Sequence, residues 1–149
     1  MCIFECTKAC GCSDDCPNRV VQKGRTVPLE VFKTKMCGWG LRTRKALKAG
    51  TFITTYAGEL ITEAETEKRA KVYERHLETS YIYDIEPHMA DNIDAGPWGN
   101  VSRFLNHSCD PNCGTYYVWT DEVFDVRRPV ICFFTRRDVA EGEELTFEY

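Results

Sequence analysis

The stretch that decides how this chain folds is Arg103-Phe104-Leu105-Asn106-His107-Ser108-Cys109-Asp110-Pro111-Asn112. An apolar run, residues 101–105, is compatible with helix or strand, and a polar segment rich in turn-forming residues follows it. Loops on a rigid base often carry function. His107 alone is ambiguous, because it could be a general base, a ligand, or a histidine satisfied by backbone hydrogen bonds, which is the commonest case.

Short strands are expected on both sides of this stretch. β-branched and aromatic runs bounded by glycine-bearing or proline-bearing turns are typical of strands. Such runs lie at residues 29–32, 51–56, 81–83, 93–95, 116–119 and 130–134, and a last segment covers residues 143–149. We expect residues 116–119 and 130–134 to pair. The pattern predicts a mainly β fold with few helices.

One helix is expected between the strands. Thr62-Glu63-Ala64-Glu65 matches a capping box, with Thr62 as the N-cap and Glu65 at the third helical position. The helix covers about residues 62–77 and is rich in Glu, Lys and Arg. Its narrow apolar face predicts an insert on the outside of the domain.

Length and charge limit the possible functions. A chain of 149 residues with 43% hydrophobic residues is long enough for one packed domain. The net charge of −4 argues against direct nucleic-acid binding through a basic face and suits a basic partner, although acidic surfaces are common. The sequence has no apolar run of about 18 residues and no signal-peptide pattern at residues 1–5, so we expect an intracellular protein without a membrane span.

Cysteines crowd the N-terminal segment. Cys6, Cys10, Cys12 and Cys16 form the pattern C-x3-C-x-C-x3-C, in which closely spaced thiolates can fold a loop around a tetrahedral zinc ion. Buried thiols and the disulfide framework of a secreted domain are the alternatives. The missing signal pattern favours zinc. We expect this segment to depend on metal for its order.

Four segments together resemble the signature motifs of the SET-domain methyltransferases, in the right order and at sensible separations. They are Gly38-Trp39-Gly40, Tyr56-Ala57-Gly58-Glu59, residues 103–109, and residues 144–149. The cysteine loop with residues 17–22 resembles the end of the pre-SET zinc region of the Suppressor-of-variegation class, which methylates lysine 9 of histone H3.

The resemblance covers essentially the whole chain and carries expectations about the fold, the activity and the cellular location. It implies a SET fold of several small curved sheets with a knot-like threading of the C-terminal segment. It divides the chain into a partial pre-SET segment at residues 1–19 and a SET domain at residues 20–149. It also implies a histone-lysine N-methyltransferase that acts on chromatin in the nucleus.

The same resemblance implies S-adenosylmethionine as the cofactor. The residues that match the family's cofactor-binding positions are Gly38, Trp39, Gly40, Tyr81, Arg103, Asn106 and His107. Glycines without side chains let the backbone approach a cofactor closely, although an isolated G-x-G would indicate only a turn. By this resemblance His107 is a binding residue and not a base.

Methyl transfer is an in-line displacement, so catalysis depends on aligning the amine and the methyl group at about 3–3.5 Å. An apolar channel beside the cationic sulfonium lowers the pKa of the lysine amine. The resemblance implies that Tyr149 is the catalytic tyrosine and Tyr56 a second channel hydroxyl; core tyrosines with satisfied hydroxyls are the alternative. Phe147 matches the position that sets product multiplicity, and its ring leaves room for di- or trimethylation.

The expected substrate is the histone H3 tail, with lysine 9 as the target, or a similar basic peptide. Asp84 and Glu86 match carboxylates that contact basic residues of the tail, and a solvated acidic face is the alternative. An extended peptide would add beside a sheet edge, where backbone hydrogen bonds give affinity.

The sequence departs from the family pattern at both ends. Only the last cysteines of the pre-SET cluster are matched, and the post-SET Cys-x-Cys-x4-Cys segment, which closes the lysine channel in the family, is expected to be absent. Cys109 matches the remaining post-SET zinc ligand, and one ligand cannot hold a structural zinc. Two alternatives stay open: a SET enzyme for another histone or non-histone lysine, and a catalytically silent, zinc-supported module that binds histone tails.

Overall fold

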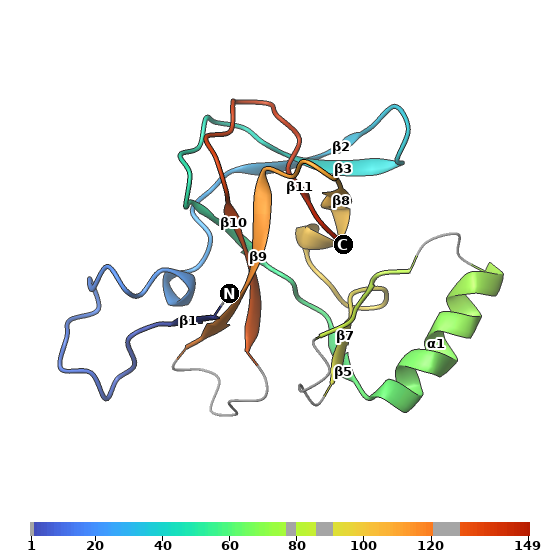
Figure 1. The fold of residues 1–149 in the computed structure, drawn as a ribbon, viewed down its shortest axis with the longest axis horizontal. Helices are drawn as coiled ribbons and strands as arrows, with labels where there is room; N and C mark the ends of the chain where they lie inside the picture. The colour runs from blue at the N-terminus through green and yellow to red at the C-terminus, as the bar shows by residue number, and fades with distance from the viewer. Residues whose placement is uncertain (1, 77–79, 86–90, 121–128) are drawn as a thin grey trace.

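The computed structural model describes residues 2–76, 80–85, 91–120 and 129–149 (Figure 1). In chain order its strands and helices are β1 (Cys2–Phe4), the 3₁₀ helix η1 (Val21–Lys23), β2 (Leu29–Lys33), β3 (Trp39–Thr43), β4 (Phe52–Thr55), β5 (Glu59–Ile61), α1 (Glu63–His76), β6 (Ile82–Tyr83), β7 (Asn92–Asp94), the 3₁₀ helix η2 (Val101–Phe104), β8 (Asn106–His107), β9 (Cys113–Trp119), β10 (Val130–Thr135) and β11 (Thr146–Phe147). Strands dominate, and α1 is the one α-helix within these ranges, which confirms the mainly β prediction. No described helix is long and apolar enough to cross a membrane.

The largest sheet has the strand order β1-β9-β10-β4. Its strands β9 and β10 pair antiparallel, which confirms the pairing expected from the sequence. Because successive side chains of a strand point to opposite faces, β10 serves two cores. Ile131 and Phe133 are buried in the main core, and Cys132 packs with Phe52 and Val118 in a second one. Burial on both faces explains why residues 130–134 form an unbroken apolar run.

The N-terminal strand joins this sheet, which the sequence analysis did not anticipate. β1 lies parallel to β9, with Cys2 opposite Tyr117 and Phe4 opposite Trp119. The rings of Phe4 and Trp119 stack with centroids 4.8 Å apart. The cysteine-bearing segment is therefore tied to the central sheet through its first strand, and its loop extends away from that sheet (Figure 1).

The described residues form three smaller sheets as well. They are the hairpin β2-β3, the sheet β5-β7-β6, and the parallel pair β11-β8. The pair β11-β8 sets Thr146 opposite Asn106 and Phe147 opposite His107, so two of the sequence motifs lie side by side. The expected small sheets are confirmed, whereas the knot-like threading stays a prediction.

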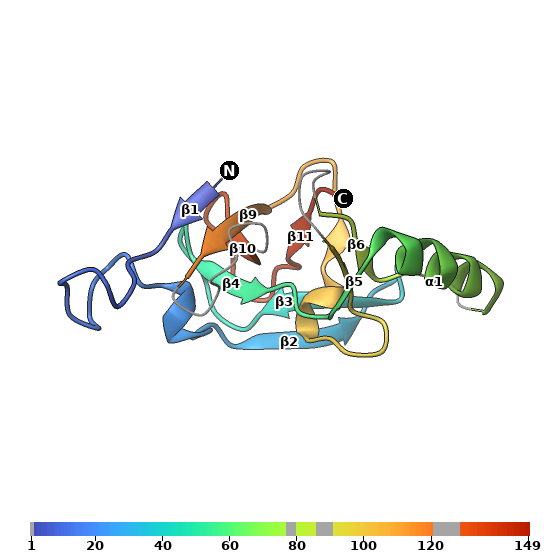
Figure 2. The ribbon, with the colours of Figure 1, turned by 90° about the horizontal axis from the view of Figure 1, so that it is seen from below.

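The predicted helix begins where the capping box placed it. Thr62 Oγ1 accepts a hydrogen bond from the backbone N–H of Glu65 at 3.4 Å, and α1 runs from Glu63 to His76. The helix lies at one end of the molecule and the cysteine loop at the other (Figure 2). The ambiguous run at residues 101–105 forms the 3₁₀ helix η2, capped by the Asn100 side chain, which accepts from the N–H of Ser102 at 2.9 Å.

Candidate active site

A cavity of about 290 Å³ lies where β6, η2 and the C-terminal segment meet the end of β4. Its lining residues are Tyr56, Ser80, Tyr81, Ile82, Tyr83, Asp84, Ser102, Arg103, Leu105, Phe147, Glu148 and Tyr149. The cavity thus brings together six of the residues predicted for catalysis, cofactor or substrate, which are Tyr56, Tyr81, Asp84, Arg103, Phe147 and Tyr149.

Aromatic rings form the wall of the cavity that faces the main core. Phe147 is 5% exposed, and its ring centroid lies 4.8 Å from those of Phe133 and Tyr149. The Tyr56 ring lies 5.1 Å from that of Tyr83. The Tyr56 hydroxyl donates to the carbonyl of Tyr81 at 2.7 Å. Burial raises the pKa of Tyr56, with the neighbouring Tyr149 adding to the effect, so its phenol stays neutral at physiological pH.

Tyr149 is fixed at both its backbone and its hydroxyl. Its hydroxyl donates to the carbonyl of Leu105 at 3.0 Å, and its backbone N–H donates to Nδ1 of His107 at 3.2 Å. Although 75% of the residue is exposed, partial burial of the phenol raises its pKa, and Tyr81 and Cys37 add to the effect. A neutral hydroxyl that already donates its proton can still accept a hydrogen bond from a ligand.

His107 contacts groups of the chain itself. Besides the hydrogen bond at Nδ1, its Nε2 lies 3.5 Å from Sγ of Cys109, and its ring meets the Tyr149 ring edge-on with centroids 5.4 Å apart. Because Nδ1 accepts from a backbone N–H, the neutral ring carries its proton on Nε2. His107 therefore orients Tyr149, a role that the residue pattern did not reveal.

Arg103 and Tyr81 form a polar part of the cavity lining. The guanidinium carbon of Arg103 lies 4.0 Å from the Tyr81 ring centroid, and Arg103 Nη1 donates to the carbonyl of Gly96 at 3.0 Å. Arg103 Nε and the hydroxyl of Ser102 are buried and have no hydrogen-bond partner within the described residues. Leaving such atoms buried and unpaired is costly. Arg103 gives this part of the cavity lining a positive charge and hydrogen-bond donors.

The Gly38-Trp39-Gly40 segment is not part of the cavity lining. Gly38 has a φ of 68°, which favours glycine, and a Cβ on Gly40 would lie 2.7 Å from Glu144 Oε1, so a side chain there would displace the Glu144 carboxylate. The side-chain amide of Asn106 donates to the carbonyl of Trp39 at 3.2 Å and to Glu144 Oε1 at 2.8 Å. Asn106 thus links three of the four motif segments.

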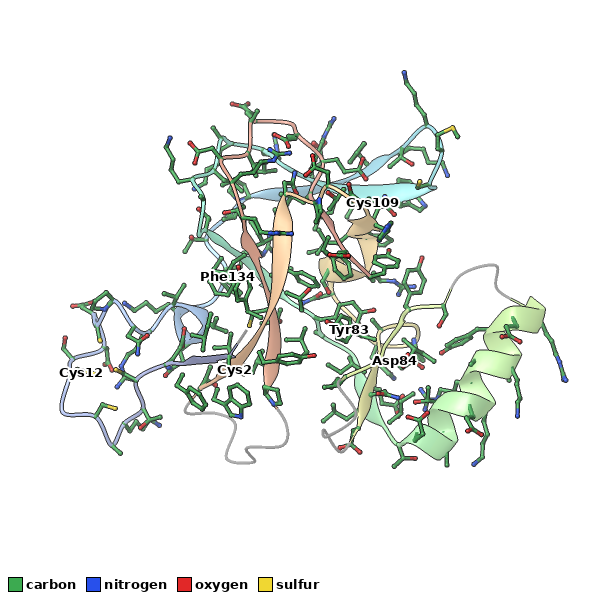
Figure 3. All side chains as sticks on the ribbon, in the orientation of Figure 1. Cys2, Cys12, Tyr83, Asp84, Cys109 and Phe134 are labelled. Carbon is green, nitrogen blue, oxygen red and sulfur yellow. The ribbon has the colours of Figure 1, made fainter. Side chains whose placement is uncertain are left out.

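The predicted substrate carboxylates have different outcomes. Asp84 follows Tyr83 after β6 and lines the cavity (Figure 3). Glu148, which was not assigned to substrate from the sequence, also lines it. Glu86 lies outside the described residues. Two carboxylates in the lining of one cavity suit a basic ligand.

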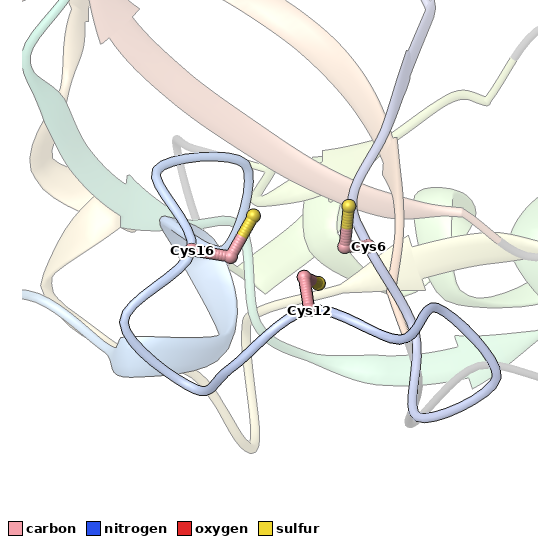
Figure 4. Close-up of side chains that lie close together, drawn as sticks. All are labelled: Cys6, Cys12 and Cys16. Atoms are coloured by element: carbon pink, nitrogen blue, oxygen red, sulfur yellow. The ribbon is translucent and has the colours of Figure 1, made fainter.

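Three of the predicted metal ligands come together. The thiol sulfurs of Cys6, Cys12 and Cys16 all lie within 4.8 Å of one another (Figure 4). Cys10 is not part of this group; its sulfur lies 3.9 Å from Thr7 Oγ1, and its N–H donates to the carbonyl of Thr7. Cys109 belongs to no group of three or more possible metal ligands within the described residues.

Comparisons with known proteins agree on one family. The model of the SET domain matches residues 38–149. The H3 lysine-9 specific histone-lysine N-methyltransferase of Schizosaccharomyces pombe is 48% identical over 152 residues, covering 99% of this chain and 30% of that protein. Histone-lysine N-methyltransferase Su(var)3-9 of Drosophila melanogaster is 43% identical over 152 residues, covering 99% of this chain and 24% of that protein. Histone-lysine N-methyltransferase SUV39H2 of Bos taurus is 44% identical over 149 residues, covering 99% of this chain and 36% of that protein. The chain thus spans well under half the length of these curated relatives.

Proposed function

This chain belongs to the SET-domain family, and from that membership we propose that it transfers methyl groups from S-adenosylmethionine to lysine 9 of the histone H3 tail. The names of its relatives support this reaction, and that of the Schizosaccharomyces pombe protein supports the target. The observation that carries the proposal is the cavity shared by Tyr56, Phe147 and Tyr149. Such a protein acts on chromatin in the nucleus.

The aromatic wall suits a lysine side chain. Phe147 and the ring faces of Tyr56 and Tyr149 offer apolar surface to the methylene stem. Desolvation among these rings favours the neutral, nucleophilic amine. The two hydroxyls donate to the carbonyls of Tyr81 and Leu105, so their oxygens are left as acceptors for the amine N–H groups. Tyr149 and Tyr56 thereby orient the amine toward the methyl donor.

The polar side of the cavity suits the cofactor. S-adenosylmethionine supplies the activated methyl group and a positive charge that repels a protonated lysine. We assign its binding to Tyr81 and Arg103, together with Asn106, His107 and the turn Gly38-Trp39-Gly40. The guanidinium of Arg103 in the cavity lining supports this assignment, because it can pair with the carboxylate of the cofactor's methionine part.

The substrate enters along β6 in this proposal. Within the described residues β6 pairs with β7 on one side only, so its other edge can accept an extended peptide. Asp84 and Glu148 would contact basic residues next to the target lysine. Glu86 remains a prediction for the same role.

We assign zinc to the cysteine loop. Cys6, Cys12 and Cys16 supply three close thiolates, and Cys10 completes a tetrahedral set if it turns away from Thr7. Residues 1–19 then act as a partial pre-SET segment next to a SET domain at residues 20–149. Cys109 is left as a ligand for a zinc shared with a post-SET segment.

Phe147 sets the number of methyl groups in this proposal. With an apolar ring at a position that is 5% exposed, no hydroxyl restrains the methylated amine. We expect the wild-type chain to yield di- and trimethyl-lysine and the Phe147→Tyr variant to stop mainly at monomethyl-lysine. A time course by mass spectrometry distinguishes them, and a wild type that stops at monomethyl-lysine would contradict the assignment.

The proposed function is tested with the zinc-loaded chain, S-adenosylmethionine and H3 tail peptides. Mass spectrometry should find methyl groups on lysine 9 and none on a peptide in which lysine 9 is replaced by arginine. Methylation of another lysine alone would overturn the target. Peptide binding without any transfer, both by this chain and by a version extended with a post-SET segment, would overturn the reaction and favour a tail-binding module.

A further inference from the structure

Asp94 is a buried carboxylate at the end of β7, and no part of the proposed reaction uses it. Its side chain is fully buried. Oδ2 accepts from Arg69 Nη1 at 2.8 Å and from the Tyr73 hydroxyl at 2.7 Å, while Oδ1 accepts from the N–H of Gly96 at 2.8 Å. Burial opposes ionisation, yet these hydrogen bonds hold the pKa of Asp94 below its usual value. A charged carboxylate thus lies under α1.

Arg69 joins α1 to this carboxylate and to two further acids. Its guanidinium pairs with Glu59 of β5 at 2.7 Å and with Glu65 of α1 at 3.0 Å, and its side chain is 22% exposed. Tyr73, one turn further along α1, supplies the second contact to Asp94. The helix is therefore attached by directional, charge-assisted contacts, because its apolar face is too narrow to anchor it.

The segment after Asp94 continues the connection to the cavity. The N–H of Ala95 donates to the carbonyl of Tyr81 at 3.0 Å, and the carbonyl of Gly96 accepts from Arg103 Nη1 at 3.0 Å. Residues 94–96 consequently hold both members of the Arg103–Tyr81 stack, whose guanidinium-to-ring distance is 4.0 Å. Gly96 fits tightly, since a Cβ there would lie 2.8 Å from the Tyr73 hydroxyl and 2.9 Å from Asp94 Oδ1.

We propose that Arg69 and Asp94 are positioning residues for the cofactor side of the cavity, acting through Gly96 on Arg103 and through Ala95 on Tyr81. The proposal rests on the proposed function, in which Arg103 and Tyr81 contact S-adenosylmethionine. It gives α1 a defined part in cofactor affinity, although the helix contributes no residue to the cavity lining. A purely structural anchor would set the stability of the fold and leave cofactor affinity unchanged.

The test uses Asp94→Asn, which keeps the shape of the side chain, and Arg69→Met, which keeps the stem. Lys48→Met is the control, because it breaks the Lys48–Asp138 ion pair, 2.6 Å long, between exposed residues that do not line the cavity. Dissociation constants for S-adenosylhomocysteine are measured by calorimetry well below each variant's melting temperature. We expect Asp94→Asn and Arg69→Met to weaken binding about tenfold and Lys48→Met to stay within twofold. Arg69→Lys, which keeps a cation, should recover part of the affinity.

Lower melting temperatures for Asp94→Asn and Arg69→Met with unchanged dissociation constants would overturn the proposal. A second readout does not need the cofactor. The guanidinium of Arg103 lies against the Tyr81 ring, so the chemical shift of its Nε–H group is sensitive to their relative position. We expect this resonance to shift in the proton–nitrogen spectrum of Asp94→Asn and not in that of Lys48→Met. If the wild type bound no cofactor, the proposed function would fail, and an unshifted resonance would separately exclude the connection from Asp94 to Arg103.

Discussion

The aromatic part and the polar part of the cavity lining are stabilised by different interactions. In the aromatic part Phe147 packs on Phe133 of the central sheet, and the contact depends on ring volume and burial. In the polar part Arg103 donates to the carbonyl of Gly96, two residues after Asp94. Asp94 in turn accepts a hydrogen bond from Arg69 of α1. Apolar packing tolerates changes of shape that keep the volume, whereas a buried polar network requires each partner in place. The aromatic side should therefore govern stability, and the polar side should govern the accuracy of ligand contacts.

The largest effect on stability should come from the aromatic side. Phe133 is fully buried and its ring contacts those of Tyr56 and Phe147. Phe133→Ala should lower the free energy of unfolding by about 3–5 kcal/mol, because it removes buried surface and leaves a cavity. Urea unfolding followed by circular dichroism measures the loss. Phe133→Leu is the control, with an expected loss of less than half as much, and equal losses for both would contradict a contact based on volume.

A smaller loss of unfolding free energy is expected when Asp94, which supports the polar part of the cavity, is changed. Removing one partner of a buried ion pair typically costs about 3–5 kcal/mol, but Arg69 keeps Glu59 and Glu65 when Asp94 is changed. We expect about 2 kcal/mol for Asp94→Ala. A double-mutant cycle with Arg69→Met should show coupling of about 1 kcal/mol or more. Additive losses would mean that the two residues do not act as a unit.

The smallest expected effect is a loss of stability at acidic pH. The pKa of Glu143 is lowered from 4.5 to about 2, first by Arg137 and then by the N–H of Ala140. A carboxyl whose folded pKa is depressed stabilises the fold above its unfolded pKa and loses this contribution as the pH falls through the folded pKa. Unfolding free energy should therefore fall between about pH 4.5 and 2. Because the Arg137–Glu143 ion pair is partly exposed, Glu143→Gln should reduce this fall in unfolding free energy by only about 1 kcal/mol. A pH series on both proteins checks this, and identical slopes would exclude the pair as a cause.

The sequence predicted the parts of this molecule that local patterns govern. The start of α1 followed from the capping box at Thr62, and the pairing of β9 with β10 followed from two apolar runs. The resemblance also named six of the twelve residues that line the cavity, and two of its motifs lie side by side at β8 and β11.

The long-range polar contacts could not be predicted in this way. Nothing near Asp94 in the sequence indicates Arg69 as its partner, since the contact depends on how α1 packs on β7. A single acid inside the apolar strand signal at residues 93–95 was the available hint. The pairing of β1 with β9 was missed for a similar reason, because a three-residue strand has too little pattern to reveal its partner.

The most direct test of the account compares methyl transfer by the wild type and the Tyr149→Phe variant. The change removes one hydroxyl whose oxygen would accept from the lysine amine and leaves the ring contacts with Phe147 and His107. We predict a fall in kcat of about a hundredfold, with the dissociation constant for S-adenosylhomocysteine unchanged within twofold. A variant that transfers methyl groups at the wild-type rate would contradict the assignment of this cavity as the site of transfer.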